Sequence, residues 1–226
     1  MSMHAHFIVA ASLGVGIQPT AIAVVEQEVL KSDRWLEETG GLQLRHLERL
    51  PVDTTYPKTV DRIATLLGAS EIKDDERCGG AQVVLDITGS GRAVLGLFER
   101  ADIRPVVVRI IGAGQREEQV KPTWDWHVPK IELAGVLRVV FEAGRLQMAK
   151  DLELVQTLMN ELREFKMRPV RIDPGDPETW RDTEFDDLVF AVALAAWRAS
   201  RYVPTPQIIR ERYARKPRKT ASPWAA

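Results

Sequence analysis

The pattern of apolar and polar positions predicts three strands, one after another, at the start of the chain. Residues 7–11 and 20–27 are apolar runs of strand length, and a glycine-containing turn at 13–19 lies between them. Residues 42–50 partly alternate between apolar and polar side chains, as in a strand with one buried face. Because the links between these segments are short, we expect an antiparallel meander.

The period of the pattern changes after this meander. Apolar side chains recur at helical spacing in four segments: 60–67, 94–101, 133–141 and 155–162. The continuous apolar run at 83–85 is typical of a strand covered on both faces. Residues 106–111, "VVVRII", predict another buried strand, and residues 145–149 predict a further short strand. Segment 187–199 is apolar on nearly every side, which predicts a helix buried in the core.

Three polar segments, 69–80, 112–128 and 169–185, are rich in charges, glycine or proline, and we expect loops there. Hairpin strands come first in this order of elements, and strands that need helical crossovers come later. The sequence therefore predicts an α/β fold with a mixed sheet, an antiparallel meander followed by parallel strands, flanked by helices.

The length of 226 residues fits one domain over residues 1–200 and a basic tail over 201–226. Seven basic residues against one acid give this tail a net charge of +6, although the whole chain carries −1. A basic tail on an acidic body indicates either contact with a polyanion or a flexible, solubilising end. The single cysteine, Cys78, excludes an internal disulfide and a cysteine-based zinc site. With no basic leader and no membrane-spanning run, we expect a cytoplasmic protein.

Two acidic positions are candidates for chemistry. Asp86 follows the strand 83–85, and a carboxylate there would lie at the edge of the sheet where α/β proteins build their sites. Asp186 and Asp187 open the apolar helix. Each position also fits a helix cap, which would need no chemistry. If the three acids meet at one sheet edge, their oxygens suit Mg²⁺ or Mn²⁺, and a pair of such ions can cleave phosphodiesters.

Several segments, in this order, resemble the nuclease domain of phage terminase large subunits, the motor proteins of DNA packaging. They are "LGVGIQPTAIAVVE", "VVLDITGSGRAVLGLFERADI", "VPKIEL", "GRLQMAKDLELVQTLMNELREF" and "FDDLVFAVALAAW". The resemblance covers roughly residues 7–200. It implies an RNase H-like fold related to Holliday-junction resolvases and an endonuclease that needs a divalent metal. It also implies double-stranded DNA as substrate, with a packaging ATPase domain, the small terminase subunit or the portal as partners.

The resemblance assigns metal ligands to Asp86, Asp186 and Asp187, but this chain departs from the family pattern on the first strand. That strand usually ends in aspartate, and another aspartate precedes Pro-Thr-Ala, whereas this chain has Ser12 and Gln18 at these places. A serine hydroxyl adds no negative charge. We therefore expect a catalytic site of Ser12, Asp86, Asp186 and Asp187 with impaired Mg²⁺ binding, unless another acid such as Glu26 or Glu132 has taken over the role.

Other side chains are weaker candidates. Lys130 can face a phosphate, although a solvated surface lysine is the commoner case, and Trp124, Trp126 and His127 can either line a DNA groove or pack in a loop. DNA contacts are also expected from the tail: Arg210, Arg212, Arg215, Lys216, Arg218 and Lys219.

Two other functions compete with a nuclease. One is an inactive DNA-binding or assembly module of the same fold. The other is an actin-like ATPase lobe, because the segment "LGVGIQPTAIAVV" also resembles the phosphate-binding hairpin of such a lobe. No G-x-x-x-x-G-K-[ST] phosphate loop occurs in the chain.

Overall fold

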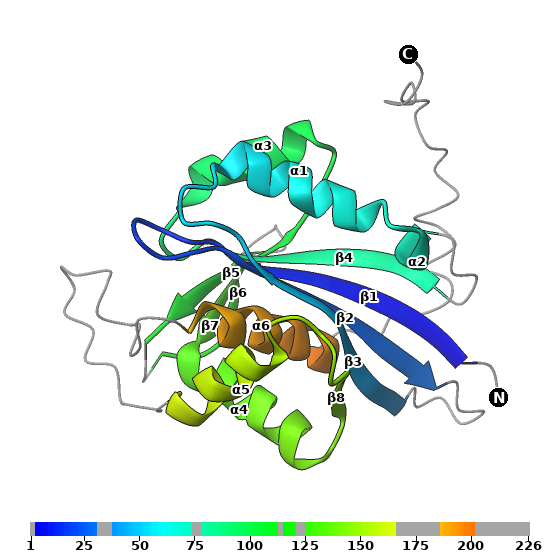
Figure 1. Cartoon of the computed structure of the whole chain (residues 1–226). Coiled ribbons are helices and arrows are strands. Elements are labelled where there is room, and N and C mark those ends of the chain that lie inside the picture. The colour runs from blue at the N-terminus through cyan, green and yellow to red at the C-terminus, as the bar shows by residue number, and fades with distance from the viewer. Residues whose placement is uncertain are drawn as a thin grey trace.

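The computed structural model describes residues 3–30, 38–73, 78–112, 115–120, 125–165 and 186–201. One mixed sheet of eight strands has helices on both faces (Figure 1). The strands are β1 (Met3–Ser12), β2 (Ala21–Leu30), β3 (Glu38–Arg49), β4 (Cys78–Asp86), β5 (Val106–Ile111), β6 (Glu118–Val120), β7 (Asp125–Pro129) and β8 (Leu146–Met148). The helices are α1 (Tyr56–Leu67), α2 (Ser70–Lys73), the 3₁₀ turn η1 (Arg92–Val94), α3 (Leu95–Arg100), α4 (Lys130–Glu142), α5 (Val155–Glu164) and α6 (Asp187–Arg201).

The strand order across the sheet is β6-β7-β5-β4-β1-β2-β3-β8. Strands β1, β2 and β3 form the antiparallel meander, and β4, β5 and β7 continue the sheet parallel to β1. The predicted mixed sheet, an antiparallel meander followed by parallel strands, is therefore confirmed. This arrangement places the C-terminal ends of β1 and β4 side by side in the middle of the sheet.

Each face of the sheet packs against its own set of helices. Helices α1 and α3 cover one face, and α4, α5 and α6 cover the other (Figure 1). Strand β1 shows how the sequence sorts its side chains, because Ile8 and Ala10 belong to the cluster around α6 whereas Val9 and Ala11 belong to the cluster beneath α1 and α3. Side chains that alternate along a strand in this way build two separate cores.

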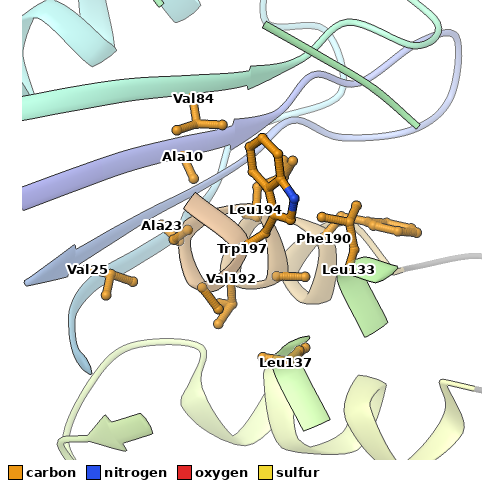
Figure 2. Close-up of a cluster of buried hydrophobic side chains, with 14 of the residues drawn as sticks. Ala10, Ala23, Val25, Val84, Leu133, Leu137, Phe190, Val192, Leu194 and Trp197 are labelled. Atoms are coloured by element: carbon orange, nitrogen blue, oxygen red, sulfur yellow. The ribbon is translucent and has the colours of Figure 1, made fainter. Parts of the chain in front are cut away.

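Helix α6 is the centre of the larger core. Its side chains from Leu188 to Ala199 are buried all round the helix, as the sequence predicts. Figure 2 shows α6 between the strands that carry Ala10 and Ala23 and helix α4, which carries Leu133 and Leu137. Trp197 is completely buried and meets Trp126 edge to face at a centroid distance of 5.6 Å. Close packing around α6 fixes its position on the sheet and therefore the position of its first turn.

The turn between β1 and β2 is tightly constrained. A Cβ on Gly14 would lie 2.1 Å from the carbonyl oxygen of Gln18, so the turn requires glycine there. The Gly14 N–H donates to the Thr20 hydroxyl at 2.9 Å, and the Tyr56 hydroxyl donates to the Gly14 carbonyl at 3.2 Å. These contacts fix the end of β1, where Ser12 lies.

Two expected loops contain regular structure. Segment 69–80 includes helix α2 and the start of β4, and segment 112–128 includes β6 and most of β7. The loop prediction was wrong at these places because apolar side chains there pack into the two cores, Ile72 of α2 into one and Trp126 and Val128 of β7 into the other. Strands β1 and β3 also begin earlier than predicted. The expected loop at 169–185, and the tail from residue 202, lie outside the described residues.

Candidate functional site

Ser12 and Asp86 lie directly beside each other at the ends of two parallel strands. They are register partners between β1 and β4. Both continue the side of the strand that carries Ala10 and Val84, so both side chains belong to the sheet face that α6 covers. Ser12 is completely buried and Asp86 almost so. The sheet therefore brings one hydroxyl and one carboxylate together beneath α6.

The direction of α6 brings its acidic end to the same place. At the C-terminal end of the helix, the Gln27 side chain donates to the carbonyl of Ala199 at 3.0 Å, and Gln27 is the register partner of His6 near the start of β1. At the other end, Asp187 contacts Arg49, whose register partner Ala21 is also the partner of Ser12. The first turn of α6 thus lies at the end of the sheet that holds Ser12 and Asp86.

Asp86 bonds locally at the end of β4. Its Oδ1 accepts from the backbone N–H of Thr88 at 2.9 Å and also contacts the Thr88 hydroxyl. The Thr88 hydroxyl in turn accepts from the N–H of Ile110 at 2.8 Å, which ties this end of β4 to β5. Neither η1 nor α3 has a side-chain cap, so the helix-cap explanation of Asp86 is wrong.

Asp187 is held by an arginine from the sheet. Arg49, the last residue of β3, donates from Nε to Oδ2 of Asp187 at 2.8 Å and from Nη2 to Oδ1 at 2.9 Å. The same Nη2 contacts Glu161 of α5. Burial lowers the pKa of Arg49, but its hydrogen bonds to Asp187 and Glu161 outweigh this and raise the pKa. The guanidinium therefore stays charged between two buried carboxylates.

Glu161 has an unusual titration for an acid near this arginine. Burial raises the pKa of Glu161 to about 7; the Arg49 hydrogen bond opposes that rise, and the negative charge of Asp187 adds to it. Glu161 is thus partly protonated near neutral pH, whereas Arg49 stays positive.

Lys130 is buried, so the expectation of a solvated surface lysine is wrong. It begins α4 directly after β7, and its ammonium lies 5.3 Å from the ring centroid of Phe165 and 5.4 Å from that of Phe190. Phe190 is one helical turn after Asp186, and its N–H donates to the Asp186 carbonyl at 3.0 Å. Lys130 therefore places a positive charge beside the first turn of α6, and its contact with DNA stays a prediction.

The remaining candidates lie elsewhere. Glu26 is on the sheet face of α1, where it pairs with Arg45 at 2.7 Å, and Glu132 pairs with Arg201 at the far end of α6. Neither acid replaces the missing first-strand carboxylate. Trp126 packs in the core against Trp197, and His127 is a half-buried residue of β7. Trp124 and the six tail residues from Arg210 to Lys219 lie outside the described residues.

The donor set does not fit two metal ions. The Ser12 Oγ is neutral, buried and without a hydrogen-bond partner among the described residues. Both oxygens of Asp187 accept from Arg49. Among the residues that the structure describes, no group of three or more His, Cys, Asp or Glu side chains could hold a metal ion. Two divalent cations need several anionic ligands, which this arrangement does not offer.

Sequence reasoning missed Arg49 and Glu161. Arg49 is an ordinary charged residue at the end of an alternating strand, and Glu161 is a polar position of an amphipathic helix. Their partners are 138 and 112 residues away in sequence, which leaves no local signal for either contact. Only the docking of α5 and α6 on the sheet brings the three charges together.

No protein-family model and no curated protein matches the chain. Solved structures with a similar fold are nuclease domains of large terminases. The large terminase nuclease of thermophilic phage G20c is 21% identical, with a TM-score of 0.47 over 84% of this chain and 81% of that one. The Mn-soaked terminase nuclease domain of human cytomegalovirus is 10% identical, with a TM-score of 0.48 over 86% and 82%. The nuclease domain of the bacteriophage SPP1 large terminase with bound Mn is 12% identical, with a TM-score of 0.46 over 85% and 86%.

No helix in the described part of the chain is long and apolar enough to cross a membrane.

Proposed function

We propose that this chain is a terminase-type nuclease domain that binds double-stranded DNA and whose divalent-metal site is impaired. The observation that carries the proposal is the register between β1 and β4, which sets Ser12 directly beside Asp86 beneath the acidic first turn of α6. A sheet edge with acids from a central strand and from a late helix is where such a nuclease holds its ions. Strand β1 would have to supply a further carboxylate to this site, but it supplies only the neutral hydroxyl of Ser12.

Asp86, Asp186 and Asp187 are the proposed ligands of Mg²⁺ or Mn²⁺. When bound, such an ion would polarise the scissile phosphate and lower the pKa of a water nucleophile. Lys130 supplies a further positive charge beside the first turn of α6, in addition to Arg49, and offsets part of the acidic charge there. Because both oxygens of Asp187 accept from Arg49, the proposed site offers too few carboxylate oxygens for two ions.

A second candidate function is an inactive DNA-binding or assembly module of the same fold. The two hydrogen bonds from Arg49 to Asp187 favour it, because they neutralise a ligand without any metal. No observation on the described residues favours an actin-like ATPase lobe.

Cleavage of supercoiled plasmid separates these candidates. We expect little or no cutting by the unmodified chain in Mg²⁺, some in Mn²⁺, and at least about tenfold more after Ser12→Asp, because the added carboxylate completes the ligand set. Ser12→Asp together with Asp86→Ala should cut no better than the unmodified chain. Robust Mg²⁺-dependent cutting without any substitution would contradict the impaired site. No gain from Ser12→Asp would favour the inactive module.

DNA binding in EDTA tests the part that both candidates share. We expect salt-sensitive binding of duplex DNA, measured by fluorescence anisotropy, because basic side chains displace counterions from phosphates. Deleting residues 202–226 should weaken the binding and flatten its salt dependence, since six of the seven basic residues of the tail lie there. If the full chain binds no duplex, the proposal is wrong. An unchanged salt dependence after the deletion would remove the tail from the interface.

A further inference from the structure

The Arg49 guanidinium lies where a metal cation would lie, between two carboxylates. It comes from the sheet, whereas its partners Asp187 and Glu161 come from α6 and α5. Its planar fork meets both oxygens of Asp187, at 2.8 and 2.9 Å, and also contacts Oε1 of Glu161. A guanidinium bound in this way holds two carboxylates at a fixed separation.

The two carboxylates depend on this charge because they are buried. Asp187 and Glu161 are almost completely removed from water, and Arg49 is only partly exposed. Oε2 of Glu161 is buried, and a hydrogen bond from the backbone N–H of Val189 in the first turn of α6 lowers the pKa of this carboxyl. A buried carboxylate without a cation or donor is costly, so this pair of acids requires a positive charge between them.

We propose that Arg49 is a built-in cation in the place where Asp187 and Glu161 would otherwise bind a divalent metal ion. Asp187 and Glu161 then supply oxygens from two helices, α6 and α5. This inference concerns the site of the proposed function and rests on it. It adds a ligand, Glu161, and a residue that excludes the ion, Arg49.

The competing explanation is an ordinary structural salt bridge that ties α5 and α6 to β3. Both explanations expect the protein to lose stability when Arg49 is removed, because two buried acids lose their counter-ion. Only the built-in cation expects a divalent ion to take the place of the guanidinium. The test therefore has to measure metal binding and its effect on stability rather than activity.

The experiment uses the full chain, freed of metal with EDTA and then dialysed, and compares it with Arg49→Met, which keeps an unbranched apolar stem and removes the guanidinium with its charge. Titration calorimetry with MnCl₂ should show one more bound ion in the variant than in the unmodified protein. In thermal melts, a hundredfold excess of Mn²⁺ over its Kd should raise the Tm of Arg49→Met by about 5–10 °C and that of the unmodified chain by much less.

Two controls identify the ligands. Adding Glu161→Gln to Arg49→Met should abolish the extra ion and the Tm shift, because the amide removes one anionic ligand. Arg201→Met removes an arginine that also lies between two acids, Glu117 and Glu132, but these acids are more exposed. Water already solvates them, so we expect no comparable Mn²⁺ effect. An equal effect in Arg201→Met would overturn the proposal, since the response would then not depend on the buried pair.

The remaining outcomes also decide the question. If Arg49→Met is unfolded without metal, recovery of its circular dichroism in Mn²⁺ but not in NaCl of equal ionic strength supports the built-in cation. Absence of extra Mn²⁺ binding, or of that recovery, overturns it. These measurements contain no DNA, so a chain that fails to bind duplex DNA refutes the proposed function and leaves the Mn²⁺ result to be read separately.

Discussion

The two ends of α6 carry the same arrangement of charges in different surroundings. At the first turn, Arg49 lies between Asp187 and Glu161, and at the last residue, Arg201 lies between Glu117 and Glu132. The arginines are similarly exposed, at 22% and 24%, but their acids are not. Asp187 and Glu161 are 1% and 7% exposed, whereas Glu117 and Glu132 are 21% and 44% exposed.

The difference in burial of the acids distinguishes the surface ion pairs of Arg201 from the candidate site at Arg49. The charges at both ends of α6 interact favourably with the helix dipole, because an acid lies at its start and arginines lie at its end. The dipole therefore does not show that either end is functional. Burial is what distinguishes the first turn, because acids that water cannot solvate must be neutralised by a group the fold supplies. Only that end also faces Ser12 and Asp86.

The largest expected effect is on stability without metal. Arg49→Met should lower the free energy of unfolding by about 3–5 kcal/mol, because it leaves two buried acids without a counter-ion. Arg201→Met should cost about 0–1 kcal/mol, since its partners remain hydrated. Urea denaturation at pH 7 with EDTA measures both. Equal losses would remove the distinction between the two ends.

The pH dependence of stability should also differ between the ends. The pKa of Glu161 is raised from 4.5 to about 7 in the folded protein. Between these values the folded state holds a proton that the unfolded state has released, so the free energy of unfolding falls as pH rises through this window. Glu161 contributes a fall of at most about 3 kcal/mol.

Urea denaturation between pH 4.5 and 7.5 tests this assignment. Glu161→Gln should flatten the fall in stability, because the amide does not titrate. Glu132→Gln, at the opposite end of α6, should leave the fall unchanged. A steep fall that persists in Glu161→Gln would assign the proton to another group.

The smallest expected effect compares two serines. Ser12→Ala should be neutral or stabilise by up to about 1 kcal/mol, because its buried hydroxyl makes no hydrogen bond with the described residues. Ser200→Ala should cost about 0.5 kcal/mol, because that hydroxyl donates to the Trp197 carbonyl at 2.8 Å near the surface. Calorimetric melts in EDTA measure both, and a loss above about 1 kcal/mol for Ser12→Ala would indicate a polar partner for this hydroxyl.

Much of the fold follows from the apolar pattern. Helix α6 is apolar on all sides over more than three turns, and β5 is apolar at every position except Arg109, so each could be located from sequence. Strands β6 and β7 could not, because they have three and five residues and carry charges, tryptophan and histidine. Such short segments show no period, and only their position at the edge of an existing sheet makes them strands.

The candidate site was predictable in part for a related reason. Asp86, Asp186 and Asp187 lie at the ends of apolar segments, and a charge there is visible in sequence. Arg49 and Glu161 interrupt no apolar segment, and their contact depends on how two helices dock on a sheet. Lys130 was misjudged because lysines are usually exposed, whereas Phe165 and Phe190 enclose this one.

Helix α6 packs against β1 and β2, yet it follows them in the chain by more than 150 residues. During synthesis, one apolar face of the sheet therefore stays uncovered until α6 has been made. Contacts over such sequence distances form slowly, so we expect this intermediate to be long-lived and to depend on chaperones. The same delay means that no partly made chain can bring the first turn of α6 to the end of the sheet that holds Asp86. The site is completed only when the core is.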